Sequence, residues 1–158
     1  MIYFDNVSKV YPDGTTALDM VTLSVKQGEF VSIVGHSGAG KTTLVKLLLG
    51  EDTATCGSVS FDSVNIQKVK AKDMPELRRR IGIIFQDFRL LPNKTAYENV
   101  AFAMEVAGKT DEEIDSDVPH VLELVDLSQK MWNLPRQLSG GEVQRVAIAR
   151  AIVNHPDL

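Results

Sequence analysis

Residues 35–42 read Gly35-His36-Ser37-Gly38-Ala39-Gly40-Lys41-Thr42 and lie between a short apolar run and a helix-forming segment. They fit the pattern G-x-x-x-x-G-K-[ST], whose glycines let successive backbone amides turn toward phosphate oxygens. In this pattern the lysine, here Lys41, reaches the β- and γ-phosphates of a nucleotide, and the hydroxyl of Thr42 is a Mg²⁺ ligand. The positive end of the helix that follows adds to the attraction. The stretch predicts a nucleotide-binding loop formed by Gly35, His36, Ser37, Gly38, Ala39, Gly40, Lys41, Thr42 and Thr43.

Apolar runs and turn residues on both sides of the loop predict strands. Residues 30–34 and 81–85 are short apolar runs without a helical period, and we expect both to be buried strands, the first of them covered on both faces. Further strands are expected at residues 2–7, 18–25 and 57–62. Together with the helices, these strands predict an α/β core.

Capping boxes, in which Ser or Thr precedes Glu by three residues, predict the starts of three helices. They begin at Thr95, Thr110 and Ser139. Behind the second box the apolar side chains keep helical spacing, but Pro119 is expected to kink or divide that helix. Shorter helices are expected at residues 41–49, with Gly50 placed to end the helix, and at residues 75–80. Helix signals dominate from residue 87 to residue 138 and predict a helical insertion in the α/β core.

Composition argues against several classes of protein. The net charge of −4 disfavours a dedicated nucleic-acid binder, so we expect no nucleic-acid partner. Cys56 is the single cysteine, which rules out an intrachain disulfide and favours a reducing compartment. The first residues do not resemble a secretory signal, and no apolar run approaches the ~20 residues that span a membrane. We expect a soluble, cytoplasmic protein that reaches a membrane only through a partner.

A second helix start has the chemistry of an anion site. In Leu138-Ser139-Gly140-Gly141-Glu142-Val143-Gln144-Arg145 the serine caps a helix whose first turn exposes two glycine amides and a hydroxyl. This site lies far along the chain from the first loop. From these residues alone, a helix that is merely well capped remains an open alternative.

The same stretch, followed by Ala149-Arg150-Ala151, resembles the signature motif of the ATP-binding-cassette (ABC) ATPases. Tyr11 resembles the aromatic residue that stacks on adenine in that family. Gln86, which follows Ile83-Ile84-Phe85, resembles the Q-loop glutamine that contacts Mg²⁺ and links to a membrane partner. The resemblance covers the whole chain and implies a P-loop NTPase core with an N-terminal antiparallel β subdomain and a helical subdomain.

The resemblance also implies how ATP is bound and hydrolysed. Two chains would form a head-to-tail homodimer, in which each ATP and Mg²⁺ lies between the loop of one chain and the signature residues of the other. Lys41 and Gln86 would be the catalytic residues, and Thr42 and Gln86 the metal ligands. The signature residues that would contact the nucleotide are Ser139, Gly140, Gly141 and Glu142.

The family's order of motifs implies a division of the chain into three parts. Residues 1–86 would form the ATP-binding core with its β subdomain, residues 87–138 the helical subdomain and residues 139–158 the signature helix. In the family, a strand with a Mg²⁺-binding aspartate and a catalytic glutamate, and then a switch histidine, follow the position of Leu158. We therefore expect residues 1–158 by themselves to lack turnover.

Within the family, several segments are similar to the FtsE group of cell-division ATPases, which pair with the membrane protein FtsX. They include Gly35-His36-Ser37-Gly38-Ala39-Gly40, Phe85-Gln86-Asp87-Phe88-Arg89-Leu90-Leu91, and Glu142, where the wider family more often has Gln. The implied partner is an FtsX-like polytopic membrane protein, and the implied location is the cytoplasmic face of the cell membrane. An ATPase of the lipoprotein-releasing or macrolide-exporting type stays open as an alternative. A P-loop kinase of small molecules would leave residues 139–145 and Gln86 unexplained.

Overall fold

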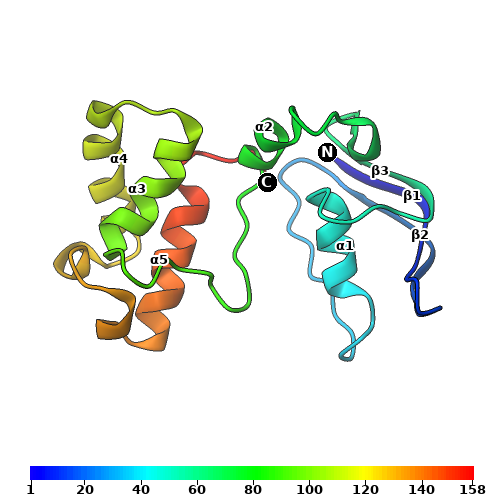
Figure 1. The fold of residues 1–158 in the computed structure, drawn as a ribbon, viewed down its shortest axis with the longest axis horizontal. Helices are drawn as coiled ribbons and strands as arrows, with labels where there is room; N and C mark the ends of the chain where they lie inside the picture. Colours follow the sequence, from blue (N-terminus) through cyan, green and yellow to red (C-terminus); the bar gives the residue numbers. More distant parts are fainter. The chain divides into compact units, whose positions relative to one another are not determined.

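The computed structural model describes residues 1–158, which form two compact units, Met1–Pro75 and Glu76–Leu158 (Figure 1). Each unit has its own buried core and is described by itself. None of the helices has the length and apolar character that a membrane-spanning helix needs.

The first unit is built on a four-stranded antiparallel sheet with the strand order β2-β1-β3-β4. Its strands are β1 (Ile2–Val10), β2 (Thr16–Val25), β3 (Cys56–Phe61) and β4 (Val64–Asn65). β1 pairs with both β2 and β3, so Phe4 has Leu23 as its partner on one side and Val59 on the other. The strands predicted at residues 2–7, 18–25 and 57–62 are confirmed, and so is the antiparallel β subdomain.

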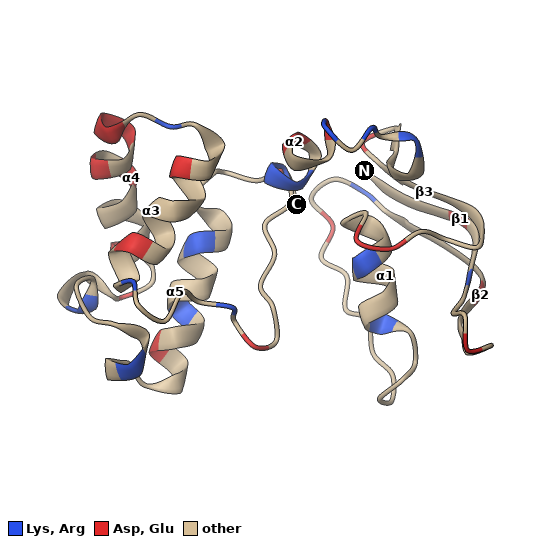
Figure 2. Cartoon of the chain, viewed as in Figure 1, with Lys and Arg blue, Asp and Glu red and all other residues tan.

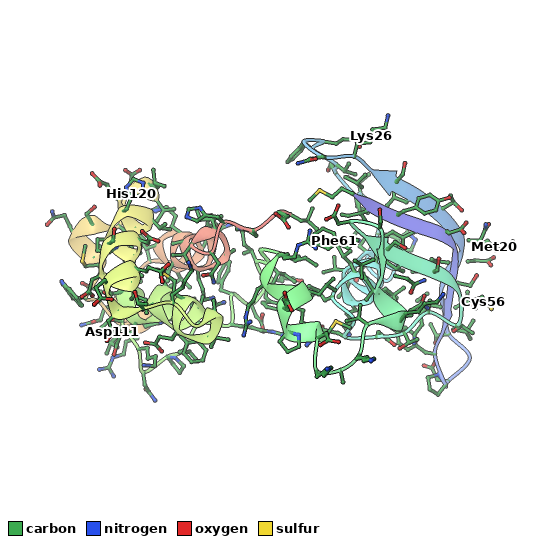
Figure 3. All side chains as sticks on the ribbon, turned by 90° about the horizontal axis from the view of Figure 1, so that it is seen from above. Met20, Lys26, Cys56, Phe61, Asp111 and His120 are labelled. Carbon is green, nitrogen blue, oxygen red and sulfur yellow. The ribbon has the colours of Figure 1, made fainter.

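Alternating side chains give the sheet a buried face and an exposed face. In β2, Val21 and Leu23 are partly covered, whereas Thr22 is exposed. Each large apolar side chain that is fully buried contributes about 1.5–3 kcal/mol to stability. Figure 3 shows Phe61 in the interior of this unit and Met20 at its margin. The core combines strand residues with one helix, α1 (Lys41–Leu48), and includes Ile2, Phe4, Val7, Leu47, Val59 and Phe61.

The second unit is helical. It contains α3 (Ala96–Ala107), α4 (Asp111–Leu124) and α5 (Gly140–Ile152), which pack against one another, and α2 (Met74–Arg79) leads into it (Figure 1). Its single-turn 3-10 helices are η2 (Ser128–Lys130) and η3 (Pro135–Gln137), and a further one, η1 (Ile66–Lys68), belongs to the first unit. The capping boxes at Thr95, Thr110 and Ser139 are confirmed. The core that α3, α4 and α5 share includes Val100, Met104, Val118, Leu122, Leu127 and Val146.

Two strand predictions are wrong. Residues 30–34 and 81–85 form no strand, and the first segment is not buried, because Phe30 is 94% and Val34 86% exposed. In the second segment only Ile81 is buried. A strand exists only where its amides and carbonyls pair with a neighbouring strand, and the sheet of this structure has no member next to either segment. Apolar composition without a hydrogen-bonded neighbour leaves both segments irregular.

Of the two outcomes expected at Pro119, a kink or a division of the helix, the structure shows no division. α4 runs from Asp111 to Leu124 with Pro119 inside it. Proline removes one backbone hydrogen bond and crowds the preceding turn. The apolar face of α4, which includes the buried Val118 and Leu122, packs in the core on both sides of the proline. This packing holds the helix together through Pro119.

Candidate nucleotide-binding site

The glycine-rich loop is fixed to the sheet at Gly40. This residue has φ +82°, in the left-handed region, and is the N-cap of α1. A Cβ atom at Gly40 would lie 2.4 Å from the carbonyl oxygen of Ala17 and 2.9 Å from the Leu18 side chain. Any other residue there would have to move the loop away from β2, so glycine sets the close approach of the loop to the sheet.

The N-terminus of α1 is left without a cap. No side chain accepts a hydrogen bond from its first turn, and no acidic residue lies in that turn. The first amides of a helix have no partner within the helix, and together with the helix dipole they attract an anion. The start of α1 is therefore an open anion site.

Lys41 lies across the loop in front of this site. Its Nζ atom donates to the carbonyl oxygens of Gly35 and His36, at 2.7 Å each. An ammonium group has three donors, so these two contacts hold the positive charge at the loop and leave one donor for a ligand. Thr42, the next residue, is exposed.

Tyr11 contacts α1, the helix that follows the glycine-rich loop. Its hydroxyl lies 3.4 Å from the Oγ1 atom of Thr43, which is buried in α1. The ammonium of Lys9 lies 5.0 Å from the centre of the Tyr11 ring, a cation–π contact. Lys9 also pairs with Asp52, and the hydrogen bond from Lys9 lowers the pKa of the Asp52 carboxyl. The ring predicted to meet adenine is thus held at its hydroxyl by α1 and at its face by Lys9.

The start of α5, unlike that of α1, carries a complete capping box. The Ser139 amide donates to the Glu142 carboxylate at 2.7 Å, and the Glu142 amide donates to the Ser139 hydroxyl oxygen at 3.3 Å. The bond from the Ser139 amide lowers the pKa of Glu142. Gly140 and Gly141 are exposed. A Cβ atom would meet nothing within 4 Å at Gly140 and only the Arg145 guanidinium, at 4.0 Å, at Gly141. The packing of this chain gives no reason for glycine at either position.

Gln86 is exposed and begins an irregular segment, residues 86–95, which two helices hold in place. Phe88 and Arg89 have φ values of 57° and 46°, which are unfavourable for residues with a side chain. Arg150, on α5, donates to the carbonyl oxygens of both, at 2.6 and 2.7 Å. Partial burial lowers the pKa of the Arg150 guanidinium.

The other half of this segment is held by Asn99, a fully buried residue of α3. Its Oδ1 accepts from the Leu91 amide at 2.7 Å, and its Nδ2 donates to carbonyl oxygens of Leu91, Lys94 and Thr95. All the hydrogen-bonding groups of the amide are thereby used. Residues 86–95 are irregular in backbone shape but fixed by side chains from α3 and α5.

The residues named from the sequence are thus distributed over both units. The structure brings Tyr11 together with Thr43 and the loop in the first unit. Gln86 and residues 139–142 belong to the second unit. Sequence reasoning missed Lys9, Asn99 and Arg150 as supporting residues. Arg150 lies in the stretch that resembles the signature motif, but that motif does not indicate its contacts, because the partners of all three lie far along the chain or in backbone groups.

Comparison with known proteins agrees with this geometry. The family model described as ABC transporter matches residues 18–158. "Cell division ATP-binding protein FtsE" of Streptococcus pneumoniae is 52% identical over 99% of this chain and 68% of its own length. FtsE of Escherichia coli is 47% identical, over 99% of this chain and 70% of its own length. "Methionine import ATP-binding protein MetN" of Helicobacter pylori is 45% identical, over 100% of this chain and 48% of its own length.

A solved structure has the same fold. It is a dimeric ATP-binding cassette in a post-hydrolysis state bound to ADP and Pi, with a TM-score of 0.89 and 38% identity over 99% of this chain and 71% of that one. A family match over most of the chain, relatives of 45–52% identity over nearly the whole of this chain and a shared fold all agree. The chain belongs to the ABC transporter family and has the P-loop NTPase fold of its ATP-binding cassettes.

Proposed function

We propose that this chain is the ATP-binding and ATP-hydrolysing subunit of an FtsE–FtsX-like complex, in which ATP turnover acts on a membrane partner in cell division. The observation that carries ATP binding is the uncapped N-terminus of α1, with Gly40 packed on β2 and the ammonium of Lys41 at the loop. Amides, a lysine and an exposed hydroxyl are the groups that bind a triphosphate and its metal ion.

The roles of the residues follow from their chemistry. The amides of residues 35–43 would bind phosphate oxygens, Lys41 would bind the terminal phosphates, and Tyr11 would pack on the base. Thr42 and Gln86 carry the oxygen ligands that Mg²⁺ prefers. When bound, Mg²⁺ neutralises charge that develops on the phosphates. The division into residues 1–86, 87–138 and 139–158 belongs to the same proposal.

A second copy of the chain would complete the site. Gly140 and Gly141 are exposed, and a Cβ atom would meet nothing within 4 Å at Gly140 and only the Arg145 guanidinium, at 4.0 Å, at Gly141. The Ser139 oxygen accepts from the Glu142 amide, but a hydroxyl can accept and donate at once, so its proton remains for a phosphate oxygen. We propose that Ser139 and Gly141 bind the γ-phosphate of the ATP held by the partner chain. The dimeric state of the solved cassette supports this arrangement.

We propose that the membrane partner docks on Gln86 and the segment that follows it. Arg150 and Asn99 fix this segment, and a preorganised surface loses little entropy on binding. The names of several similar proteins support a role in cell division, and we propose that this role is carried out at the cytoplasmic face of the membrane. A transport subunit is the second candidate, because the methionine-import ATPase is 45% identical over the whole chain. The exporter alternatives, of the lipoprotein-releasing or macrolide type, have the same ATP site.

Equilibrium binding of a fluorescent ATP analogue to the complete gene product tests the site. We expect Lys41→Ala to weaken binding about ten- to a hundred-fold, since a hydrogen bond to a charged group contributes about 1.5–3 kcal/mol. Lys46→Ala removes an exposed lysine at the other end of the same helix and is the matched control. Equal binding by both variants would overturn the assignment of the loop.

Purification from detergent-solubilised native membranes tests the partner. Recovery of one polytopic protein with a large extracytoplasmic loop, together with regulators of wall hydrolases, supports the division role. Recovery of a transport permease keeps the ATPase assignment and overturns the division role.

A further inference from the structure

A hollow of about 410 Å³ opens on the first unit in the segment between β4 and α2. No residue of the glycine-rich loop lines it. In Figure 2 this part of the chain carries several stretches coloured for Lys and Arg. The lining consists of Val64, Asn65, Lys68, Val69, Lys70 and Asp73.

Three lysines, Lys68, Lys70 and Lys72, occupy alternate positions along this segment and are exposed. None of their ammonium groups forms an ion pair. Other lysines of the chain do, since Lys9 and Lys109 each pair with a carboxylate. Between residues 64 and 73 the only acidic residue is Asp73, so the segment has a net positive charge in a chain whose net charge is −4. We call Lys68, Lys70 and Lys72 the lysine surface.

The rest of the lining adds donors and apolar contact. The Oδ1 atom of Asn65 already accepts from the Gln67 amide at 3.0 Å, so the Asn65 side chain offers its N–H groups. Val64 is 40% exposed and Val69 is half-buried. Unpaired cations and amide donors beside exposed methyl groups match an amphiphile with an anionic head.

We propose that the lysine surface binds the headgroups of anionic phospholipids. A lysine is a mobile point charge, which suits a fluid layer of phosphates better than a fixed, bidentate contact. A basic residue near an anionic membrane contributes about 1 kcal/mol, which corresponds to about a five-fold increase in partitioning. This inference goes beyond the proposed function, because the lysine surface lies outside the ATP site and the segment assigned to the membrane partner.

The test measures co-sedimentation of the complete gene product with vesicles, in the absence of nucleotide and of any membrane partner. Vesicles of phosphatidylcholine alone are compared with vesicles that also contain phosphatidylglycerol. The variant Lys68→Gln/Lys70→Gln/Lys72→Gln removes the lysine surface. The variant Lys26→Gln/Lys46→Gln/Lys130→Gln removes three exposed lysines elsewhere and is the matched control for net charge.

We expect partitioning to require phosphatidylglycerol and to fall on the order of a hundred-fold in the first triple variant, but far less in the control. Asp73→Asn should increase partitioning into phosphatidylglycerol vesicles about five-fold, without any increase in the protein that sediments in the absence of vesicles, which separates the gain from aggregation. Equal loss in both triple variants, or equal binding to both kinds of vesicle, overturns the proposal. Binding of an acidic peptide by the lysine surface without vesicle binding also overturns it. Because Lys41→Ala should leave partitioning unchanged, failure of this proposal is distinguishable from failure of the ATP-site assignment.

Discussion

We propose that the N-termini of α1 and α5 both bind phosphate, but the two helix starts differ in how they are capped. α1 begins behind Gly40 with a lysine in its first turn, no acid and no side-chain cap. α5 begins behind Ser139 with a carboxylate in its first turn and a complete capping box. The first turn of α1 therefore has no side chain that accepts hydrogen bonds from its amides, whereas the capping box of α5 satisfies part of the hydrogen-bonding capacity of its first turn.

This difference indicates that the two helix starts have different roles in ATP binding. An uncapped helix start gains the most from an anion, so α1 is suited to hold ATP in a single chain. The box at α5 keeps that helix formed without a ligand, while Gly140 and Gly141 stay exposed for a phosphate that arrives from outside. We therefore expect α1 to be the primary binding site and α5 to bind phosphate only when it is held by a partner chain.

The largest expected effect is a difference in stability between two glycine-to-alanine variants. Gly40→Ala should destabilise the protein by about 2–4 kcal/mol, from left-handed strain and from collision with the Ala17 carbonyl. It should also abolish ATP binding. Gly140→Ala, which meets open space, should change stability by no more than about 0.5 kcal/mol. Chemical denaturation of the two variants measures both effects, and equal destabilisation would remove the structural basis of the comparison.

The next effect concerns the far end of α5. Arg150→Met should destabilise the second unit by about 1–3 kcal/mol, because the carbonyl groups of Phe88 and Arg89 lose charged donors. Hydrogen exchange of residues 88–91 should become faster, while ATP binding at α1 stays unchanged. Arg136→Met, at an exposed site, is the matched control. Unaltered exchange in Arg150→Met would show that α5 does not hold this segment.

A smaller effect is expected at the Ser139 cap. Ser139→Ala should cost about 1 kcal/mol of stability, the usual value of an N-cap. Affinity for ATP in a single chain should not change, but ATP-dependent turnover should fall. Thermal unfolding, with Ser116→Ala on α4 as the control, measures the stability change. If Ser139→Ala weakened ATP binding by a single chain, the two helix starts would belong to one site.

The smallest effect is a pH dependence confined to α5. The folded-state pKa of Glu142 is lowered, so its charge stabilises the folded state above its unfolded pKa of about 4.3 and loses this effect as the pH falls through the folded pKa. The stability difference between the natural chain and Glu142→Gln should therefore shrink below about pH 4. Denaturation curves at several pH values measure this difference. A stability difference that stays constant across acidic pH would contradict a charged Glu142 in the capping box.

Local signals explain what could be predicted from the sequence. The loop at residues 35–43 and the three capping boxes depend on neighbours within a few residues, so their patterns are visible in the chain itself. The contacts of Lys9 with Asp52 and of Arg150 with Phe88 join residues 43 and 62 positions apart. Nothing local distinguishes these charged residues from other surface charges.

The wrong predictions have a related cause. Residues 30–34 and 81–85 have strand composition, but a strand depends on a partner that composition does not reveal. At Pro119 the local rule was outweighed by burial of Val118 and Leu122. In both cases tertiary contacts, or their absence, decided the outcome.

The central claim is that α1 binds ATP within one chain and that α5 binds it only across a dimer. Sedimentation velocity of the complete gene product with a slowly hydrolysed ATP analogue tests this claim directly, when binding is measured in parallel. Gly141→Glu places a carboxylate at the start of α5, where the only atom within 4.0 Å of the added Cβ belongs to the Arg145 guanidinium, and this carboxylate would repel phosphate. The account predicts that this variant binds the analogue with natural affinity but stays monomeric, whereas the natural chain dimerises. Dimerisation of Gly141→Glu, or loss of binding by its monomer, would contradict the account.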